Sequence, residues 1–280
     1  MNDDGFVPRA RRNPSFSLGA ALVAMLVLAA GVSLVWTPYP PGAIDVPRRL
    51  LEPSPIHWLG TDSLGRDIVS QLLAGARVSI LVGVIAVGIG LSFGVALGLV
   101  AVSAKGIVED AIMRLCDFTF AFPALLLAIM LTAVFGAGVV NAIIAIGVFN
   151  VPVFAKLTRA VGQGVLARDY TLAARAAGKG PAAIAFEHVL PNVAPALIVQ
   201  ATIQFAVAIL AEAALSYLGL GAQPPEASWG RMLSEAQQQM FAAPRLAVFP
   251  GLAVALAVLG LNLLGDGLRD LLDPRLRARR

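Results

Sequence analysis

Long apolar runs separated by shorter polar segments dominate the pattern of the chain. An apolar run of about 18 residues or more is long enough to cross the hydrocarbon core of a bilayer as a helix. Six runs reach that length, with approximate limits 18–36, 78–103, 118–136, 139–157, 194–216 and 246–265. The pattern therefore predicts an all-α membrane protein with six transmembrane helices.

The first apolar run allows two interpretations, because it follows the basic cluster "RARR" at 9–12. A secretory signal peptide also begins with basic residues and continues with an apolar stretch. The run at 18–36 is longer than the usual apolar core of a signal peptide, and no clean small-residue cleavage site follows it. We therefore expect the run to be retained as the first transmembrane helix.

Composition supports a membrane protein and excludes several other classes. The chain is 58% hydrophobic and only 14% charged, with a mean hydropathy of +0.80. One cysteine, Cys116, excludes an internal disulfide framework, and His57 and His188 lie far apart without ligand spacing, so no metal site is predicted. The basic pI near 9.7 does not indicate nucleic-acid binding, because the cations lie between and beside the apolar runs.

The distribution of cations predicts how the chain is oriented in the membrane. Cytoplasmic loops carry an excess of Lys and Arg, and six spans place both termini on the same side. That side holds 15 of the 21 cations: Arg9, Arg11, Arg12, Lys105, Arg114, Lys156, Arg159, Arg168, Arg175, Lys179, Arg269, Arg275, Arg277, Arg279 and Arg280. The other side holds six: Arg48, Arg49, Arg66, Arg77, Arg231 and Arg245. We therefore expect both termini to be cytoplasmic.

This orientation divides the chain into segments with expected locations. The predicted segments are a cytoplasmic N-terminal segment 1–17, the first helix 18–36, a periplasmic segment 37–77, a core domain 78–268 with five transmembrane helices, and a cytoplasmic tail 269–280. Within the core, the outer segment 217–245 and the inner loop 158–193 are too long to be simple connectors. We expect the outer segments to form a docking or gating surface and the inner loop to meet a cytosolic partner.

Small residues repeat at every fourth position of the second predicted span. They are Ala86, Gly90, Gly94 and Gly98. Small residues at this spacing let another helix approach closely in a membrane, so the spacing predicts helix packing. The alternative is that these positions provide clearance for a substrate path.

A polar stripe follows the fifth predicted span, again in steps of four. It consists of Gln200, Gln204, Ala208, Glu212 and Ser216, which lie on one side of a helix and should avoid lipid. Because an ionised carboxylate at mid-bilayer costs about 2.5–3.5 kcal/mol, we expect Glu212 near the outer end, facing a wet cavity or paired. Lining of a translocation path or gate, interhelical hydrogen bonding and a proton relay are all compatible with the stripe.

Two carboxylates in the first outer segment resemble a pair for acid–base chemistry. They are Asp62 and Asp67, with Arg66 between them. No nucleophile or set of metal ligands accompanies them, so we interpret these residues as turn caps and a surface ion pair. An intramembrane enzyme is disfavoured for the same reason, because the spans lack clustered acids and histidines.

The inner loop contains the stretch "LAARAAGKGPAAIAFEHVLPN" at 172–192, which predicts two short helices. Asp169 suits the N-cap of a helix over 170–177, and Gly178 suits the left-handed residue after its end. Pro181 suits the first turn of a second helix, which we expect Pro191 to interrupt. The first helix could enter a groove on another protein and anchor by charge, or it could rest on lipid headgroups.

The same stretch resembles the EAA loop, roughly EAA-x3-G-x9-I-x-LP, of the membrane subunits of ABC importers. Five residues occupy its positions: Ala173, Ala174, Gly178, Leu190 and Pro191. The chain departs from the motif at Leu172, where the glutamate would stand. Three further segments, 57–83, 216–233 and 249–276, resemble the dipeptide, oligopeptide and nickel branch of these permeases, in particular its DppC/OppC-type subunit.

The resemblance implies a type I ABC importer permease fold in the bacterial inner membrane, with the EAA loop at 158–193. In the family this loop is a coupling helix that docks in a cleft of the ATPase subunit. The ATPase-coupling residues are then Leu172, Ala173, Ala174, Arg175, Gly178, Lys179, Leu190 and Pro191. The implied partners are a homologous second permease of the DppB/OppB type, two ATP-binding subunits, and a periplasmic or lipid-anchored substrate-binding protein.

The sequence also indicates where ATP must bind if it drives transport. No phosphate-binding G-x4-G-K-[ST] motif occurs, and "GKGP" at 178–181 lacks both the upstream glycine and the hydroxyl residue. We therefore expect no cofactor on this chain, no enzymatic activity, and ATP and Mg²⁺ on partner subunits. The predicted function is import of dipeptides or oligopeptides. Two alternatives stay open: the same architecture importing nickel or another small solute, and an ion-coupled carrier acting alone.

Overall fold

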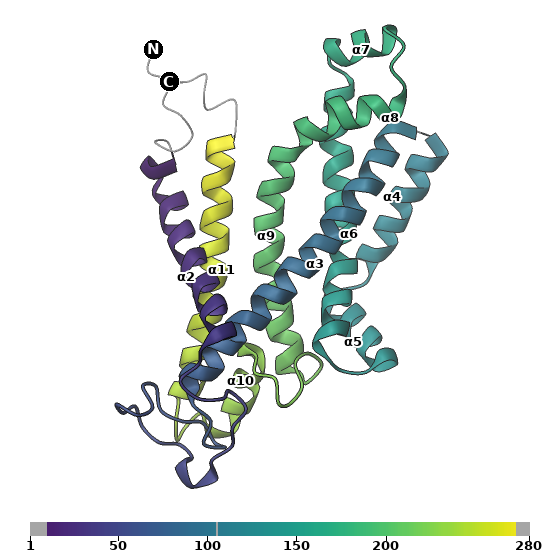
Figure 1. Ribbon diagram of the computed structural model, residues 1–280. Helices are drawn as coiled ribbons and strands as arrows, with labels where there is room; N and C mark the ends of the chain where they lie inside the picture. The colour runs from purple at the N-terminus through teal and green to yellow at the C-terminus, as the bar shows by residue number, and fades with distance from the viewer. Residues whose placement is uncertain (1–9, 105, 273–280) are drawn as a thin grey trace.

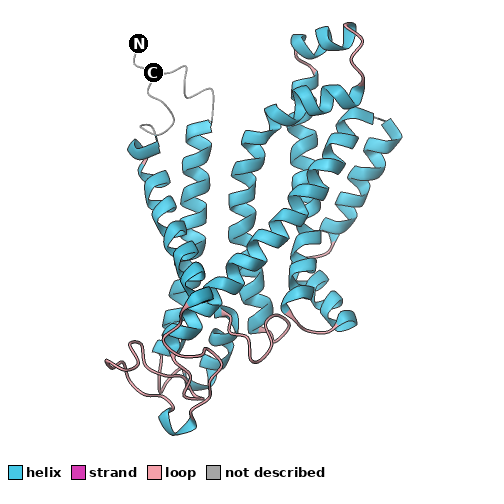
Figure 2. Ribbon diagram, in the orientation of Figure 1, coloured by secondary structure: helices cyan, strands magenta, loops and turns pink. Residues whose placement is uncertain are grey.

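A computed structural model of the chain describes residues 10–104 and 106–272. Its main helices are α2 (Pro14–Val35), α3 (Ile68–Ala104), α4 (Gly106–Ala121), α5 (Ala124–Phe135), α6 (Val139–Leu166), α7 (Asp169–Ala176), α8 (Pro181–Ile184), α9 (Leu190–Tyr217), α10 (Trp229–Ala236) and α11 (Arg245–Leu272). Shorter helical turns are η1 (Val46–Arg48), η2 (Ala185–Val189) and η3 (Gln237–Gln239). The described residues form no strand, which confirms the all-α prediction (Figure 2).

Several residues used in the orientation argument lie outside the described part of the chain. They are Arg9, Lys105, Arg275, Arg277, Arg279 and Arg280. The first nine residues of the predicted N-terminal segment and the last eight of the predicted tail are outside it as well.

Five helices within the described residues are long and apolar enough to cross a membrane: α2, α3, α6, the continuous helix Pro181–Tyr217, and α11. A sixth crossing exists if the bent pair α4 and α5 is one span. The predicted span over 118–136 does not correspond to a single straight helix. This region contains the end of α4, a break at 122–123 and then α5, with a bend of 85° between the two helices. Pro123 lies at the break, and its ring cannot continue the preceding helix.

The helices form a bundle with distinct ends (Figure 1). The start of α2, the end of α11 and the short helix α7 all lie at one end, and the segment 36–67 and α10 lie at the other. Helix α3 crosses the bundle and packs along α6, while α11 packs along α2 and α9. This arrangement places the EAA-like loop at the end where the described chain also begins and ends.

Glycines bring the backbones of α3 and α6 together. A Cβ atom on Gly94 would lie 2.5 Å from the carbonyl oxygen of Val151, and one on Gly98 would lie 2.5 Å from Cβ of Thr158. A Cβ on Gly90 would overlap Asn150. All three glycines are buried, so this face of α3 is covered by a helix of the same chain.

Replacing Gly94 with leucine should destabilise the chain by about 1–3 kcal/mol, because the added side chain would overpack the contact with α6. Gly88→Leu on the same helix is the matched control, since a Cβ at Gly88 would meet no described residue within 4 Å other than its chain neighbours and the adjacent helix backbone. Thermal unfolding in detergent is the measurement. We expect a lower midpoint for Gly94→Leu and an unchanged or higher one for Gly88→Leu. Equal midpoints for the two variants would contradict the packing described here.

The second half of the inner loop differs from the expected short helix. Residues 181–217 form one continuous helix in which α8 passes through the π-helical turn η2 into α9. Pro191 therefore does not interrupt the helix as predicted. It lies in the first turn of α9, directly after η2, and the wider turn keeps the preceding carbonyls away from the proline ring.

Candidate functional site

Residues at its two ends determine where the short helix α7 begins and stops. It begins at Asp169, and Arg168 precedes it as the N-cap, so the prediction of Asp169 as the capping residue was wrong by one position. At its other end, the Gly178 N–H donates to the Arg175 carbonyl (3.0 Å) and the Lys179 N–H donates to the Ala174 carbonyl (3.1 Å). These two bonds form a Schellman motif, which requires a left-handed residue, and Gly178 has φ +83°. The predicted helix and its glycine stop are therefore confirmed.

Helix α7 is attached to the bundle on both sides. Thr171 is buried, and its hydroxyl donates to the Val165 carbonyl at the end of α6 (3.0 Å). On the other side, Lys179 forms an ion pair with Glu187 of η2, and the rings of Tyr170 and His188 lie 5.8 Å apart. The orientation of α7 therefore depends on both α6 and η2.

The exposed surface of α7 carries apolar residues together with one acidic residue, Asp169, and one cation, Arg175. Leu172 is 48% exposed at the position where the EAA motif has glutamate, and Ala173 is exposed beside it. Arg175 is exposed and makes no ion pair with any residue the structure describes, whereas Lys179 is engaged by Glu187. The remaining motif positions lie nearer the bundle: Ala174 and Leu190 are half-buried, and Pro191 is exposed at the start of α9. A partner would therefore meet an apolar contact at Leu172 and a positive charge at Arg175.

The polar stripe of α9 faces neighbouring parts of the same chain. Gln204 is 6% exposed, and its Nε2 donates to Oδ1 of Asn150 on α6 (2.7 Å). Gln200, one turn earlier and half-buried, donates through Nε2 to Oε1 of Gln204 (3.3 Å). This part of the stripe thus forms an interhelical hydrogen bond between α6 and α9. Its role in lining a path stays a prediction.

The C-terminal part of the stripe connects α9 to the loop that follows it. Glu212 is 1% exposed, and Ser216 donates through Oγ to Oε1 of Glu212 (2.7 Å). The same hydroxyl accepts the backbone N–H of Ala222 (2.9 Å). Glu212 and Ser216 therefore fix the start of the loop after α9 against the end of that helix, and a gating role stays a prediction.

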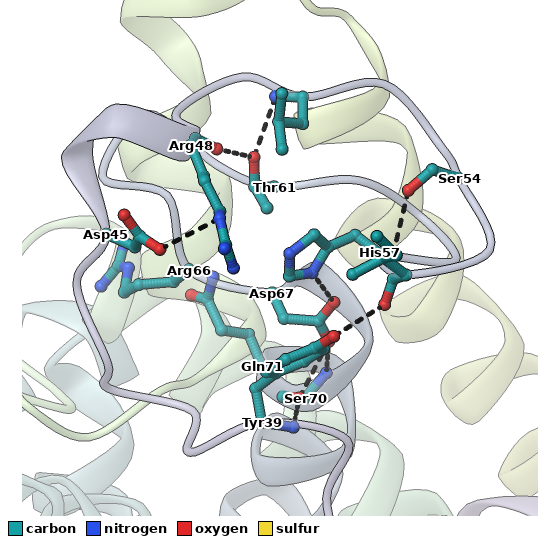
Figure 3. Close-up of polar contacts among 12 residues, drawn as sticks. Tyr39, Asp45, Arg48, Ser54, His57, Thr61, Arg66, Asp67, Ser70 and Gln71 are labelled. Carbon is teal, nitrogen blue, oxygen red and sulfur yellow. Dashed lines mark hydrogen bonds and ion pairs between the residues drawn. The ribbon is translucent and has the colours of Figure 1, made fainter.

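At the opposite end of the bundle from α7, the segment 36–67 contains a buried polar cluster (Figure 3). Asp67 is 3% exposed and accepts the backbone N–H and the hydroxyl of Ser70 through Oδ2, each at 2.8 Å, which caps the start of α3. Its Oδ1 lies 3.0 Å from Nδ1 of His57, whose ring points at the carboxylate in Figure 3. The centres of the Tyr39 and His57 rings lie 4.6 Å apart, and the backbone N–H of Tyr39 donates to the Ser70 hydroxyl.

A second part of this cluster reaches α10. Asp62 accepts Nε of Arg66 (2.6 Å) and Nε2 of Gln71 (2.8 Å) through Oδ2, and Arg66 also pairs with Glu235 of α10. Glu235 in turn accepts Nε of Arg231 (2.8 Å). Arg66 is only 8% exposed, so the expectation of a surface ion pair was wrong, although the expected turn caps are present. Sequence spacing showed the Asp62 and Arg66 pair but gave no signal for Glu235.

The chain is similar in sequence to known transport proteins. Residues 58–278 match the family "Binding-protein-dependent transport system inner membrane component". The chain is 46% identical over 226 residues to the glutathione transport system permease protein GsiD of Pectobacterium atrosepticum, covering 81% of this chain and 75% of that protein. It is 43% identical over 271 residues to GsiD of Escherichia coli, covering 96% of this chain and 89% of that protein.

A solved structure shares the fold. The inward-facing MetNI methionine ABC transporter contains a chain that matches 72% of this chain with a TM-score of 0.59, at 17% sequence identity, and 97% of that chain is covered. This likeness confirms the predicted type I ABC importer permease fold. Together with the family match it also confirms the resemblance described from the sequence. The chain belongs to the family of binding-protein-dependent transport system inner membrane components, as a multi-pass DppC/OppC-type permease subunit of an ABC importer.

Proposed function

We propose that this permease imports glutathione or short peptides. The supporting observation is 43% identity, over 96% of the chain, to a protein named as a glutathione transport system permease. Glutathione is itself a small peptide, so this substrate lies within the class predicted from the sequence. Nickel or another small solute is the alternative substrate within the same architecture.

The proposal assigns ATP and Mg²⁺ to partner subunits and coupling to α7. One of two ATP-binding subunits would receive α7 in a cleft that offers an apolar contact to Leu172 and a carboxylate to Arg175. Because Lys179 is paired with Glu187, its part is to hold the loop, so Arg175 supplies the charge for docking. A homologous permease of the DppB/OppB type would complete the path, and a substrate-binding protein would deliver the substrate.

The proposal also fixes the orientation of the chain. Helix α7, the start of α2 and the end of α11 lie at one end of the bundle (Figure 1), and the charge pattern predicts that this end is cytoplasmic. The buried cluster around Asp62 and Asp67 would then lie on the periplasmic side, where a binding protein docks.

Substrate-stimulated ATP hydrolysis by the complete complex tests the substrate class. The complex contains this chain, its partner permease, the ATPases and the binding protein, reconstituted in proteoliposomes. We expect glutathione or a dipeptide to stimulate hydrolysis, and NiCl₂ alone to have no effect. Stimulation by Ni²⁺ and not by any peptide would overturn the proposed substrate and favour the alternative.

A further inference from the structure

The helix that joins the coupling loop to the polar stripe contains one turn of π-helix. The Leu190 N–H donates to the Ala185 carbonyl, five residues earlier, within a helix that runs without a break from Pro181 to Tyr217. A π turn holds one more residue than the α-helical turn it replaces, and such turns often mark functional positions. This turn lies between Lys179, which holds α7, and the start of α9.

Local residues maintain the π turn. Pro191 has no N–H, so it cannot make the α-helical bond to the Glu187 carbonyl, and its ring would clash with that carbonyl in a regular helix. The side chain of Asn192 in α9 donates through Nδ2 to the His188 carbonyl (2.7 Å), so this carbonyl of the turn has a hydrogen-bond partner. These residues stabilise the extra residue at this position of the helix.

Packing fixes one side of the turn and leaves the other exposed. Ala185, Val189 and Val193 are buried in a cluster with residues of α3 and α6. A Cβ on Gly162 of α6 would lie 2.9 Å from Cγ1 of Val189, so α6 is in close contact with the turn. Phe186, in contrast, is 65% exposed. The turn therefore has a defined rotation relative to the bundle.

We propose that the π turn Ala185–Val189 sets the rotational phase between the coupling helix α7 and the polar stripe of α9, and so determines whether docking of α7 is transmitted to α9. This inference rests on the proposed coupling role of α7. The residues of the turn are positioning residues, since they act through α7 and α9. Removing one of them would restore regular α-helix and rotate the preceding residues by about 100° with a shift of about 1.5 Å. The contacts of Tyr170 and Lys179 with the turn could then not both be kept.

Deletion of Phe186 tests the inference, and Phe186→Ala is the matched control because it removes the side chain but keeps the residue count. Both variants are assembled with the partner subunits in proteoliposomes. We expect the deletion to reduce substrate-stimulated ATP hydrolysis about tenfold or more, which corresponds to about 1.4 kcal/mol of lost coupling. Hydrolysis without substrate should stay measurable, and Phe186→Ala should stay within about twofold of the wild type. Full stimulation after the deletion, or an equal loss in Phe186→Ala, would overturn the inference.

Two further variants keep the test decisive. Pro191→Ala retains the residue count but supplies an N–H, so the π turn can move along the helix, and we expect an intermediate loss of stimulation. If the deletion variant does not assemble, wild-type stimulation in Pro191→Ala would overturn the inference instead. Gly178→Trp separates the two proposals: if it abolishes stimulation and the Phe186 deletion does not, only the role of the π turn fails. If neither variant reduces stimulation, the coupling role of α7 fails as well.

Discussion

Replacing Gly178 with tryptophan is expected to reduce substrate-stimulated ATP hydrolysis of the assembled complex about tenfold, while the chain still inserts and assembles. Gly178 has φ +83°, and a side chain in this left-handed conformation costs about 1–2 kcal/mol. Apart from its two chain neighbours, no residue of the described chain lies within 4 Å of a Cβ at Gly178, so the indole would project from the loop beside the surface that docks. Both effects act on the end of α7 and leave the packed helices unchanged.

Two control variants separate backbone strain from bulk. Gly178→Ala adds the strain without a large side chain. Gly180→Trp adds the same indole two residues later, where φ is −70° and again nothing lies within 4 Å of a Cβ. We expect Gly178→Ala to lose part of the stimulation and Gly180→Trp to lose less than Gly178→Trp. Unaltered stimulation in Gly178→Trp would show that α7 is not the coupling element.

Replacing Asp62 with alanine is expected to destabilise the chain by about 3–5 kcal/mol, because it leaves a buried arginine with one partner fewer. Asp62 accepts four hydrogen bonds: from the backbone N–H groups of Leu64 (2.8 Å) and Arg66 (2.9 Å), from the Arg66 side chain and from Gln71. Denaturant or thermal unfolding in detergent measures the effect. We expect a clear shift of the midpoint.

An exposed ion pair in the same segment provides the control. Asp45 pairs with Arg48 at 3.5 Å, with side chains 44% and 60% exposed, so Asp45→Ala should change stability by about 0–1 kcal/mol. A similar small change in Asp62→Ala would mean that the buried cluster does not hold segment 36–67 against α3 and α10.

Much of the fold follows from hydrophobic length alone, because a helix that crosses a bilayer needs a long apolar run. Helices α3, α6, α9 and α11 each contain one predicted span, and α2 covers all but the last residue of another. The bend after α4 could not be read from hydropathy, since residues on both sides of Pro123 are apolar and the run continues through the break. At Pro191 the sequence predicted an interruption of the helix that the structure does not have. The reason is that a π turn accommodates a proline that would break a regular helix.

In the candidate site, local contacts could be predicted from the sequence and long-range contacts could not. The end of α7 was predictable, because a Schellman motif involves only neighbouring residues around Gly178. The buried cluster was not, because Arg66 meets Glu235 at a distance of 169 positions along the chain. The partner of Lys179 was likewise missed, since it depends on how η2 folds back beside α7.

Uptake of labelled glutathione or dipeptide into proteoliposomes is the most direct test of ATP-driven import through this permease. The vesicles contain either the complete complex or this chain alone, with ATP or a non-hydrolysable analogue on the ATPase side. We predict uptake only with the complete complex, its binding protein and hydrolysable ATP, and a strong reduction in the Gly178→Trp complex. Uptake by the isolated chain without ATP, driven by an ion gradient, would contradict the account.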